Sequence, residues 1–349
     1  MGFDGSEPTP GLRQMLVMLK PGGVILFARN ITNARQTWEL LRACRESVET
    51  PMFLCVDMEG GTVDRLKTAI APAPSAEAVA NTKDEKIFRA HGRLIGKEVR
   101  ALGFNTDFAP VLDLSFAASR SVLTSRTVSD DPKQAVIYAR EFLKGLREAR
   151  VLGCGKHFPG LGEANLDTHE MLPMIDKPWK RLWAEDLYPY RALRREMAFV
   201  MVAHAAYPAV TKSGIPASLS IKWMTEILRR KIGYRGLVVS DDLEMGGVQA
   251  SAPIDEAAVE TLRAGADMFL VCHNEAHVWR TYEAVVREAE NSPKFARQVA
   301  AAARRVMAFK KKSKELKTNA ARPSAATVRK LRDEMQKFTD QVQKAGAVL

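Results

Sequence analysis

Seven short apolar runs recur along the chain, at residues 22–28, 52–57, 104–110, 151–158, 199–205, 236–242 and 267–272. Within each run the apolar residues follow one another instead of alternating with polar ones, which is typical of strands buried on both faces. Such strands occur in parallel sheets that are covered by helices. The chain therefore predicts seven strand–helix units in series, in either a barrel or a doubly wound sheet.

The segments between these runs have the periodicity and the punctuation of helices. Asp131 stands directly before Pro132 and the segment "KQAVIYAREFLKGLREA", as an N-cap residue and a first-position proline would. The segment "IDEAAVETLRAG" begins with acidic residues and stops at Gly265, which is typical of a helix and its C-terminal cap. These signals predict helices over 132–149 and 254–264.

Polar side chains at the ends of the predicted strands favour the barrel. They are Asp57, Asp107, Lys156, His157, His204, Asp241 and Asp242. In a barrel the loops at the carboxyl ends of the strands converge on one pocket from all sides, whereas an open sheet gathers them only at its switch point. We therefore expect an α/β fold of the (β/α)8 TIM type.

The C-terminal region loses the apolar spacing of the preceding chain. We expect a barrel domain over residues 1–313, then a linker over 314–328 and a helix over 329–345, which either lies on the barrel or protrudes. The formal net charge is +11, and residues 301–349 hold 13 Lys or Arg and 4 Asp or Glu, a net of +9. Because few aromatic residues are interleaved with these cations, we expect no nucleic-acid partner.

The cysteines and the hydropathy indicate where the protein works. Four cysteines lie far apart without a CxxC pair, which favours reduced structural thiols over disulfides or metal ligands. No run approaches the ~20 apolar residues of a membrane span, and "MGFDGSEPTPGLRQ" lacks the basic and apolar regions of a signal peptide. We expect a cytoplasmic protein.

Asp241 is the first candidate for chemistry. The segment "GLVVSDDLEMGG" brings two adjacent carboxylates to a strand end, and successive side chains of a strand point to opposite faces. At most one of the two is therefore expected in the mouth of the barrel. Asp241 suits a metal ligand, a hydrogen-bond acceptor or a nucleophile, and Asp242 suits the cap of the following helix.

A second group of residues suits the binding of a polar substrate. Lys156 and His157 offer two neighbouring donors at a strand end, which fit the oxygens of a sugar. Asp57 lies in "VDMEGGTVDRL" with Arg65, whose guanidinium fits a carboxylate or a pair of hydroxyl groups. The segment "LTSRTVSDDP" adds Arg126. The sequence thus predicts a donor-rich pocket at the carboxyl ends of the strands.

Asp167 and His169 lie two residues apart in the glycine-rich segment "GKHFPGLGEANLDTH". A carboxylate that holds one imidazole nitrogen stabilises the imidazolium form, as a general acid near neutral pH requires. The pair could instead bind a metal together with His157 and His204. A metal site is better built on rigid strand ends than on a loop of this composition, so we expect no metal and no cofactor.

Eight motifs together resemble one family, the glycoside hydrolase family 3 β-N-acetylglucosaminidases of the NagZ type. They are "GGVILFARN", "VDMEGGTVDRL", "NTDFAPVLDL", "SRTVSDDP", "GKHFPGLGEANLDTH", "MVAHAAYP" with "PASLS", "GYRGLVVSDDLEMGGV" and "AGADMFLVC". Each motif alone is weak, but their order along residues 2–310 is specific.

The resemblance implies a role for each matching residue. Asp241 would be the nucleophile, and His169 the general acid/base with Asp167 as its partner. The N-acetylglucosaminyl group would be held by Asp57, Arg65, Arg126, Lys156 and His157. The reaction would be a retaining hydrolysis of terminal N-acetylglucosamine (GlcNAc), with peptidoglycan fragments as the expected substrates, and its acid/base histidine departs from the usual pair of carboxylates.

The sequence departs from the family pattern at three places. Leu161 stands where the family has a histidine, and Thr62 stands where an arginine is common. The family also has a strand before "GFDGSEPTP", where this sequence has Met1. We therefore expect a first strand that is missing or truncated, through a start codon upstream of Met1 or a barrel that closes imperfectly.

Several alternatives stay open at this point. A phosphorylase or a broader β-glycosidase would use the same residues, since a histidine repels incoming phosphate less than a carboxylate does. A metal-dependent amidohydrolase would use the same His and Asp residues at strand ends, but it needs paired ligands on the first strand. A non-catalytic binding barrel would need neither Asp241 nor the Asp167–His169 pair. The sequence does not predict the oligomeric state.

Overall fold

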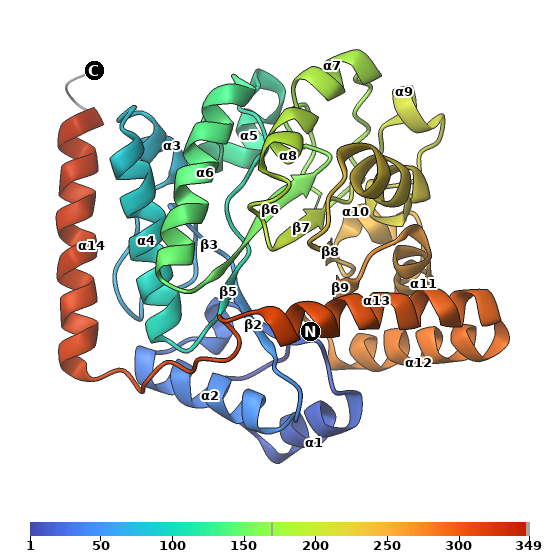
Figure 1. Cartoon of the computed structure of the whole chain (residues 1–349), viewed down its shortest axis with the longest axis horizontal. Coiled ribbons are helices and arrows are strands. Elements are labelled where there is room, and N and C mark those ends of the chain that lie inside the picture. Colours follow the sequence, from blue (N-terminus) through green and yellow to red (C-terminus); the bar gives the residue numbers. More distant parts are fainter. Residues whose placement is uncertain (169, 347–349) are drawn as a thin grey trace.

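One parallel sheet runs through the molecule. A computed structural model of the chain describes residues 1–168 and 170–346 and orders the strands β1-β2-β5-β6-β7-β8-β9 (Figure 1). The strands are β1 (Gly23–Leu26), β2 (Phe53–Val56), β5 (Thr106–Asp107), β6 (Leu152–Phe158), β7 (Phe199–Val202), β8 (Leu237–Asp242) and β9 (Met268–Leu270). All seven predicted strands are present and every neighbouring pair is parallel. The α/β fold is confirmed as a curled sheet of seven strands, whereas a complete (β/α)8 barrel is not found in the described residues.

Helices separate the strands along the chain and surround the sheet (Figure 1). They are α1 (Pro10–Leu19), α2 (Ala34–Glu46), α3 (Ala76–Ala80), α4 (Glu85–Ala101), α5 (Arg120–Leu123), α6 (Pro132–Glu148), α7 (Trp179–Ala184), α8 (Leu187–Leu193), α9 (Pro208–Thr211), α10 (Gly246–Gln249), α11 (Ile254–Ala264), α12 (Glu275–Asn291), α13 (Pro293–Lys312) and α14 (Ala325–Gly346). A π-helix, Lys222–Ile232, lies between β7 and β8. Both predicted helices are confirmed, with Asp131 capping α6 and Gly265 ending α11.

The first and last strands of the sheet are bridged by the first two residues. The terminal ammonium of Met1 donates to the Gly23 carbonyl (3.0 Å), and the amide of Ile25 donates to the Met1 carbonyl (3.0 Å). On the other side, the amide of Gly2 donates to the carbonyl of Val271, just beyond β9 (2.8 Å). These contacts join β1, from Gly23 to Ile25, to the residue that follows β9. Between the amino halves of the two strands the structure has an apolar cavity.

Helix α13 closes the amino end of the sheet. The ring of Phe309 on this helix lies 6.0 Å from the rings of Phe53 and Phe199, which begin β2 and β7. Phe53 and Phe199 also meet edge to face, with ring centroids 4.9 Å apart. Aromatic pairs in this geometry add to the free energy of burial. The apolar core inside the sheet therefore continues into the helix at its amino end.

The C-terminal helix α14 packs on the outside of α3 and α4 (Figure 1). It buries Leu331, Met335, Phe338 and Val342. The helix begins at Ala325, so the end of the predicted linker 314–328 is already helical. Of the two expectations for this helix, the one in which it lies on the barrel is confirmed, and the domain boundary at residue 313 stays a prediction.

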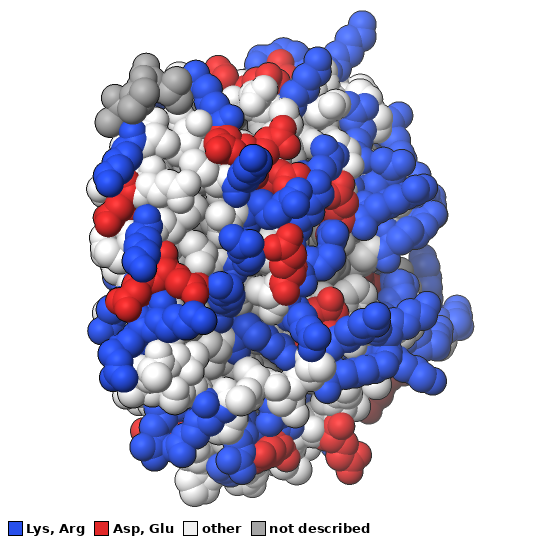
Figure 2. Space-filling model, turned by 60° about the vertical axis from the view of Figure 1, so that its left-hand side comes forward, with Lys and Arg blue, Asp and Glu red and all other residues white. Residues whose placement is uncertain are grey.

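Positive charge is spread beyond the C-terminal segment. Figure 2 shows Lys and Arg side chains crowding one side of the surface, with few Asp and Glu among them. The exposed residues Arg150, Arg195 and Arg235 each precede a strand, so they lie at the amino end of the sheet.

The four cysteines are buried and unpaired, as predicted for structural thiols. No helix of the described residues is long and apolar enough to cross a membrane.

Candidate active site

A polar cavity of about 520 Å³ opens at the carboxyl ends of the strands. Of the eight residues predicted for the site, seven line this cavity: Asp57, Arg65, Arg126, Lys156, His157, Asp167 and Asp241. His169 lies outside the described residues. The parallel sheet explains this convergence, because every strand delivers its last residues to the same end.

Lys156 lines the cavity from the end of β6. It belongs to β6, its side chain is almost completely buried, and its Nζ lies 2.7 Å from Asp57 Oδ1 and 2.7 Å from Glu59 Oε1. Burial alone would lower the pKa of Lys156, but these two carboxylates outweigh burial and raise it above its ordinary value. Lys156 is therefore a fixed cation at the bottom of the site.

Glu59 joins two of the predicted binding residues. Its carboxylate accepts two hydrogen bonds from Arg126, from Nε at 2.8 Å and from Nη2 at 2.9 Å, and it also pairs with Lys156. Burial favours the protonated carboxyl, but Arg126 and Lys156 hold the pKa of Glu59 well below its usual range. A two-point pair between guanidinium and carboxylate fixes the plane of both groups. Glu59, which the sequence analysis did not assign, therefore orients Arg126 and Lys156.

Asp113 holds His157 in a similar way. Asp113 Oδ2 lies 2.7 Å from His157 Nδ1, and its two oxygens also accept the backbone amide of His157. Asp113 Oδ1 accepts the amide of Leu161 as well (2.8 Å), so it also fixes the turn after β6. Leu161 is buried and lines the cavity with an apolar side chain, at the position where the family resemblance implies a histidine.

Asp241 lies on β8, one residue before the strand ends. Its Oδ1 accepts the backbone amide of Asp242 (2.9 Å). Burial disfavours its charge, but the imidazoles of His157 and His204 and the amide of Asp242 favour the carboxylate, and the pKa of Asp241 is lowered. Asp241 is thus ionised at neutral pH, as a nucleophile must be.

His204 is buried behind the cavity. Its Nδ1 lies 2.7 Å from Ser218 Oγ, and its Nε2 lies 2.9 Å from the carbonyl oxygen of Asp242. Burial lowers its pKa, so the ring is neutral near pH 7. His157 pairs with Asp113, and His204 with Ser218 and β8; among the described residues neither histidine belongs to a group with metal-ligand spacing.

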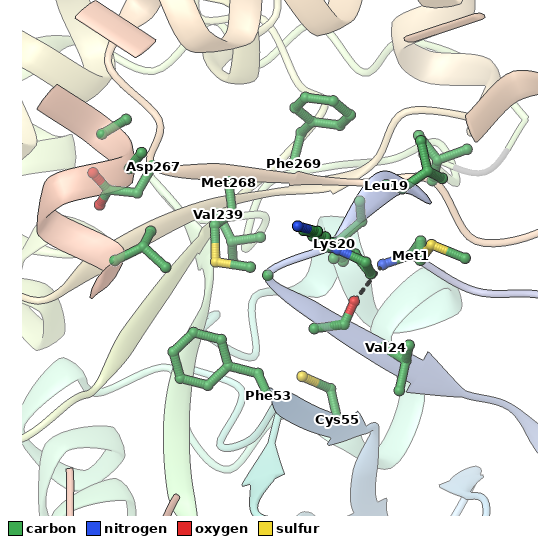
Figure 3. Close-up of a pocket in the computed structure, with 18 of the residues that line it drawn as sticks. Met1, Leu19, Lys20, Val24, Phe53, Cys55, Val239, Asp267, Met268 and Phe269 are labelled. Atoms are coloured by element: carbon green, nitrogen blue, oxygen red, sulfur yellow. Dashed lines mark hydrogen bonds between the residues drawn. The ribbon is translucent and has the colours of Figure 1, made fainter. Parts of the chain in front are cut away.

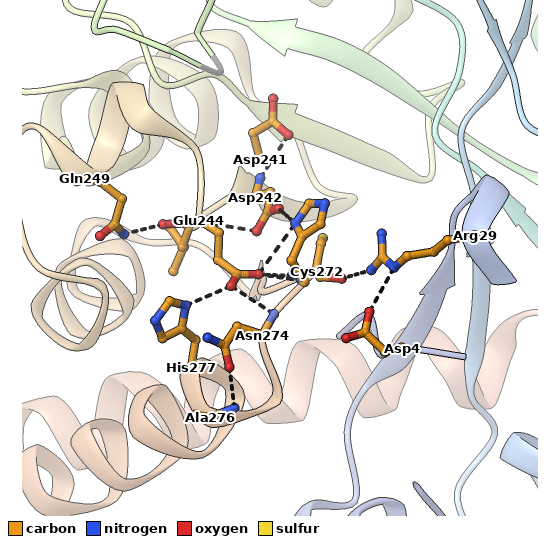
Figure 4. A network of polar contacts seen from close by, with 12 residues as sticks. Asp4, Arg29, Asp241, Asp242, Glu244, Gln249, Cys272, Asn274, Ala276 and His277 are labelled. Carbon is orange, nitrogen blue, oxygen red and sulfur yellow. Dashed lines mark hydrogen bonds and ion pairs between the residues drawn. The ribbon is translucent and has the colours of Figure 1, made fainter. Parts of the chain in front are cut away.

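Asp242 reaches the rim of the cavity. The carboxylates of Asp241 and Asp242 point in opposite directions (Figure 4), as expected for a strand, but both line the cavity, so the expectation that only one would do so is wrong. The reason is that β8 ends at Asp242 and its side chain turns towards the next strand. Asp242 Oδ1 accepts the amide of Glu244 (3.1 Å), and Oδ2 pairs with His273 Nδ1 at 3.0 Å. The prediction that Asp242 caps the following helix is wrong, because α10 begins only at Gly246 and has Met245 as its N-cap residue.

Asp242, Glu244 and His273 form the one cluster with metal-ligand spacing in the described part of the chain. Both oxygens of Glu244 already accept hydrogen bonds, including those from the amides of Cys272 (2.8 Å) and Asn274 (3.0 Å) and from His277 Nδ1 (2.7 Å) (Figure 4). These donors use the lone pairs that a cation would need. Glu244 therefore acts as the acceptor that shapes the loop after β9.

The segment that carries Asp167 begins later than its composition suggests. Strand β6 continues through Lys156 and His157 to Phe158, as the predicted strand 151–158 indicates, and it pairs there with Val111 and with Val202 of β7. Asp167 is exposed and lines the cavity. The carbonyl of Thr168 accepts the amide of Gly247 (3.0 Å), so this end of the segment is tied beside β8. The expected pairing of Asp167 with His169 lies outside the described residues.

Arg65 lines the cavity from the turn that follows the hairpin β3 (Met58–Gly60) and β4 (Val63–Asp64). Its guanidinium carbon lies 5.9 Å from the centre of the Phe27 ring. Its Nε is buried and has no hydrogen-bond partner in the described residues. A donor of this kind is available to a ligand.

The sequence contained a signal for one of the residues that the prediction missed. Glu59 follows Asp57 by two positions, so an extended backbone places both carboxylates on the same face. Asp113 follows β5 in "NTDFAPVLDL", but no spacing within the sequence connects it to His157. The sequence could therefore have indicated Glu59, whereas Asp113 required the fold.

The sequence of this chain matches a known protein family. The model of the "glycosyl hydrolase family 3 N terminal domain" matches residues 6–309. A beta-hexosaminidase of Pseudomonas aeruginosa is 36% identical over 277 residues, which cover 79% of this chain and 82% of that protein. A beta-hexosaminidase of Bordetella parapertussis is 38% identical over 260 residues, covering 72% of this chain and 73% of the relative.

Solved structures give the same result. The structure of a glycoside hydrolase family 3 beta-N-acetylglucosaminidase from a Paenibacillus species superposes with a TM-score of 0.94 at 29% identity and covers 99% of this chain. This chain spans 66% of the Paenibacillus one, which is longer. LpqI of Mycobacterium tuberculosis superposes with a TM-score of 0.80 at 31% identity, over 89% of this chain and 90% of LpqI.

Proposed function

The chain belongs to glycoside hydrolase family 3 and is a glycoside hydrolase of the beta-hexosaminidase type, and on that premise we propose that it removes terminal non-reducing GlcNAc by a retaining double displacement. The observation that carries the proposal is the ionised Asp241 at the end of β8, in a cavity it shares with Lys156, Asp57 and Arg126. A nucleophile beside fixed polar donors matches the needs of sugar transfer.

In the proposed first step, Asp241 attacks the anomeric carbon while His169 gives its proton to the leaving oxygen. The bond between the anomeric carbon and the leaving oxygen breaks, and a glycosyl ester with Asp241 forms. In the second step the neutral imidazole takes a proton from water, whose oxygen attacks the anomeric carbon and releases Asp241. Asp167 would hold the imidazole in the correct orientation during both steps.

Binding of the sugar is assigned to Asp57, Arg65, Arg126, Lys156 and His157. The support is their arrangement: Lys156 bridges two carboxylates, Arg126 is fixed by Glu59, and His157 is fixed by Asp113. Groups held in this way lose little freedom when a ligand binds, so each hydrogen bond to a hydroxyl contributes more of its strength. The unpaired Nε of Arg65 is a further donor for the substrate.

The test is hydrolysis of 4-nitrophenyl β-N-acetylglucosaminide by the wild type, Asp241→Ala and His169→Ala, with Asp255→Ala on the surface of α11 as the control. We expect Asp241→Ala to lose at least about 10⁴-fold in kcat. For His169→Ala we expect a loss of roughly 10²- to 10⁴-fold on a poor leaving group and a smaller loss on 4-nitrophenol, because an activated group departs with little protonation. Normal turnover by Asp241→Ala would refute the assignment.

The stereochemistry and the acceptor need separate measurements. Proton NMR of the first-formed product should show the β-anomer of GlcNAc, since two displacements preserve the configuration. Adding phosphate should leave the product unchanged, and formation of a sugar 1-phosphate would instead identify a phosphorylase.

For the natural substrate we propose soluble peptidoglycan fragments that end in GlcNAc, and a cytoplasmic site of action. A kcat/KM for such fragments no better than that for chitobiose would contradict this choice.

A further inference from the structure

The chain between β6 and α7, residues 159–178, carries Asp167 to the active-site cavity, and we call it the Asp167 segment. Both of its ends are held by hydrogen bonds. Near the first end, the hydroxyl of Tyr207 donates to the carbonyl of Gly160 (2.7 Å). Near the second end, the amide of Ile175 donates to the carbonyl of Ala206, beyond β7 (2.8 Å). A further cluster of charged residues, which the proposed mechanism does not use, joins the two ends to each other.

Lys177 is the buried cation of this cluster. Its side chain is 0% exposed, and its Nζ lies 2.6 Å from Glu185 Oε2, 2.6 Å from Asp186 Oδ2 and 3.3 Å from Glu163 Oε1. Nζ also lies 4.3 Å from the centre of the Phe116 ring. Burial alone would lower the pKa of Lys177, but the carboxylates, with Asp186 first, outweigh burial and raise it above its ordinary value. Lys177 is therefore a fixed positive charge among three carboxylates.

The partners of Lys177 also hold the first end of the Asp167 segment. Glu163 belongs to that end, and Asp186 packs against the two glycines that precede it. A Cβ added at Gly160 would lie only 2.7 Å from Asp186 Cβ, and one added at Gly162 would lie 3.2 Å from Asp186 Oδ1. Only residues without a side chain allow this close approach. The two ends of the segment thus share one ionic cluster, with Lys177 at its centre.

The cluster depends on Lys177 more than on its other cation. Arg181 Nη2 lies 2.7 Å from Glu163 Oε1 and 3.2 Å from Glu185 Oε2, but the Arg181 side chain is 52% exposed. Exposed ion pairs contribute little to stability, whereas removing one partner of a buried pair leaves a charge that water cannot reach. Burial raises the pKa of Asp186 to about 6, and Lys177 opposes that rise. Without Lys177, Asp186 would therefore lose its charge more readily near neutral pH.

We propose that Lys177 is a positioning residue for the reaction: by joining the two ends of the Asp167 segment, it keeps Asp167 where it can orient the acid/base residue His169. This inference rests on the proposed function. A segment with joined ends has fewer conformations than one with free ends, so less entropy is lost when its catalytic groups meet the substrate. Lys177 does not line the cavity, so it acts through Asp167 and not on the substrate.

The kinetic test compares the wild type with Lys177→Met and with Lys180→Met, an exposed control on α7. The ratio kcat/KM reports on the first step, in which the leaving oxygen takes up a proton. For chitobiose, which has a poor leaving group, we expect kcat/KM of Lys177→Met to fall by roughly 30- to 300-fold. For the 2,4-dinitrophenyl glycoside, whose leaving group departs without a proton, we expect a fall of less than about threefold. Lys180→Met should match the wild type on both substrates.

Hydrogen exchange read by mass spectrometry tests the anchoring without reference to activity. Peptides over residues 160–168 should exchange at least about tenfold faster in Lys177→Met than in the wild type, with peptides of α6 unchanged. If Lys177→Met does not fold, Glu163→Gln provides the second variant, because it removes the contact at the first end and leaves Lys177 paired with Glu185 and Asp186. Glu163→Gln should show both effects in the same direction at smaller size.

Two results would overturn the proposal. The first is an equal loss of kcat/KM on the two substrates, which is what a smaller fraction of folded enzyme would produce. The second is unchanged exchange over residues 160–168 in a folded Lys177→Met or Glu163→Gln protein. Failure of the proposed function has a different signature, because Asp241→Ala would then keep its turnover while the exchange measurement would still report on the anchoring.

Discussion

The sheet buries one lysine near each of its ends, and the two have opposite electrostatic surroundings. Lys156, near the carboxyl end, lies 2.7 Å from each of two carboxylates, which raise its pKa. Lys310, at the amino end, has no ionic partner among the described residues, and burial lowers its pKa to about 8. Both side chains are almost fully buried. The difference shows that burial alone does not decide the charge of a lysine, because the neighbouring carboxylates determine which effect prevails.

The largest expected effect comes from removing the paired lysine. In Lys156→Met, the carboxylates of Asp57 and Glu59 lose a common cation in a poorly solvated position. We expect the free energy of unfolding to fall by about 3–5 kcal/mol, which is the usual cost of breaking a buried ion pair, and glycosidase activity to be lost. Urea denaturation monitored by fluorescence gives the first quantity. A stability within 1 kcal/mol of the wild type would mean that the carboxylates are solvated well enough without Lys156.

The next effect comes from the residue that orients the donors. In Glu59→Gln, Arg126 and Lys156 keep their charges but lose the carboxylate that aligns them. We expect kcat/KM to fall by roughly 30- to 100-fold, or about 2–3 kcal/mol, mainly through KM. Steady-state kinetics separate KM from kcat, and Glu77→Gln on α3 is a control remote from the cavity. An unchanged KM would show that Glu59 contributes to stability alone.

Removing the unpaired lysine should have the opposite sign. In Lys310→Met, a buried charge without a partner is replaced by an apolar chain of similar length. We expect the free energy of unfolding at pH 7 to rise by about 1–2 kcal/mol, after allowing for a lost contact with the Phe53 ring of about 0.5–1 kcal/mol. Denaturation in parallel with Lys20→Met, which should change little, measures the gain. A clear loss of stability in Lys310→Met would instead indicate that Lys310 has a negatively charged partner, which the described residues of the apolar cavity do not include.

The smallest effect is the pH dependence of the same pair of proteins. Lys310 has a pKa of about 8 in the folded chain, whereas an unfolded lysine titrates near about 10.4. Between these values the unfolded chain holds more protons than the folded one, so wild-type stability should rise with pH by up to about 1.4 kcal/mol per unit. The advantage of Lys310→Met should therefore shrink between pH 8 and 10.5. A constant difference across this range would show that Lys310 keeps an ordinary pKa.

Lys156 provides the contrasting sign at higher pH. Its folded pKa is raised, so its contribution to stability is present below the unfolded value and is lost as the pH rises above it. Comparing wild type with Lys156→Met above pH 10.5 should therefore show a decreasing wild-type stability. The two lysines would then be distinguished by the direction of the pH effect alone.

Sequence patterns predicted the elements well because the strands are buried on both sides and therefore uniformly apolar. All seven strands and both capped helices lie where those patterns place them. Strand β6 ends at Phe158, as the run 151–158 predicts, although Lys156 and His157 near its end are polar. Pairing with the neighbouring strands, which the sequence does not encode locally, extends β6 through these polar residues.

For the candidate site, the sequence named the side chains that face the cavity but not those that hold them. Seven of the eight named residues line it. Asp113 and the bridging role of Glu59 were missed, because each depends on partners that are distant along the chain, at His157 and Arg126. The roles of Asp241, Asp167 and His169 in the reaction stay predictions. The sequence did not indicate that Lys310 is buried, because it lies in a run of basic residues, which is typical of a solvated helix face.

The bridge formed by Met1 and Gly2 has a practical consequence for anyone who expresses this chain. The terminal ammonium of Met1 is buried and donates to Gly23, at the upper edge of the apolar cavity (Figure 3). A histidine tag fused ahead of Met1 would replace that ammonium with an uncharged amide, which has a single N–H to donate to the Gly23 carbonyl. A purification tag at the carboxyl end of the chain leaves the contacts of Met1 with Gly23 and Ile25 unchanged.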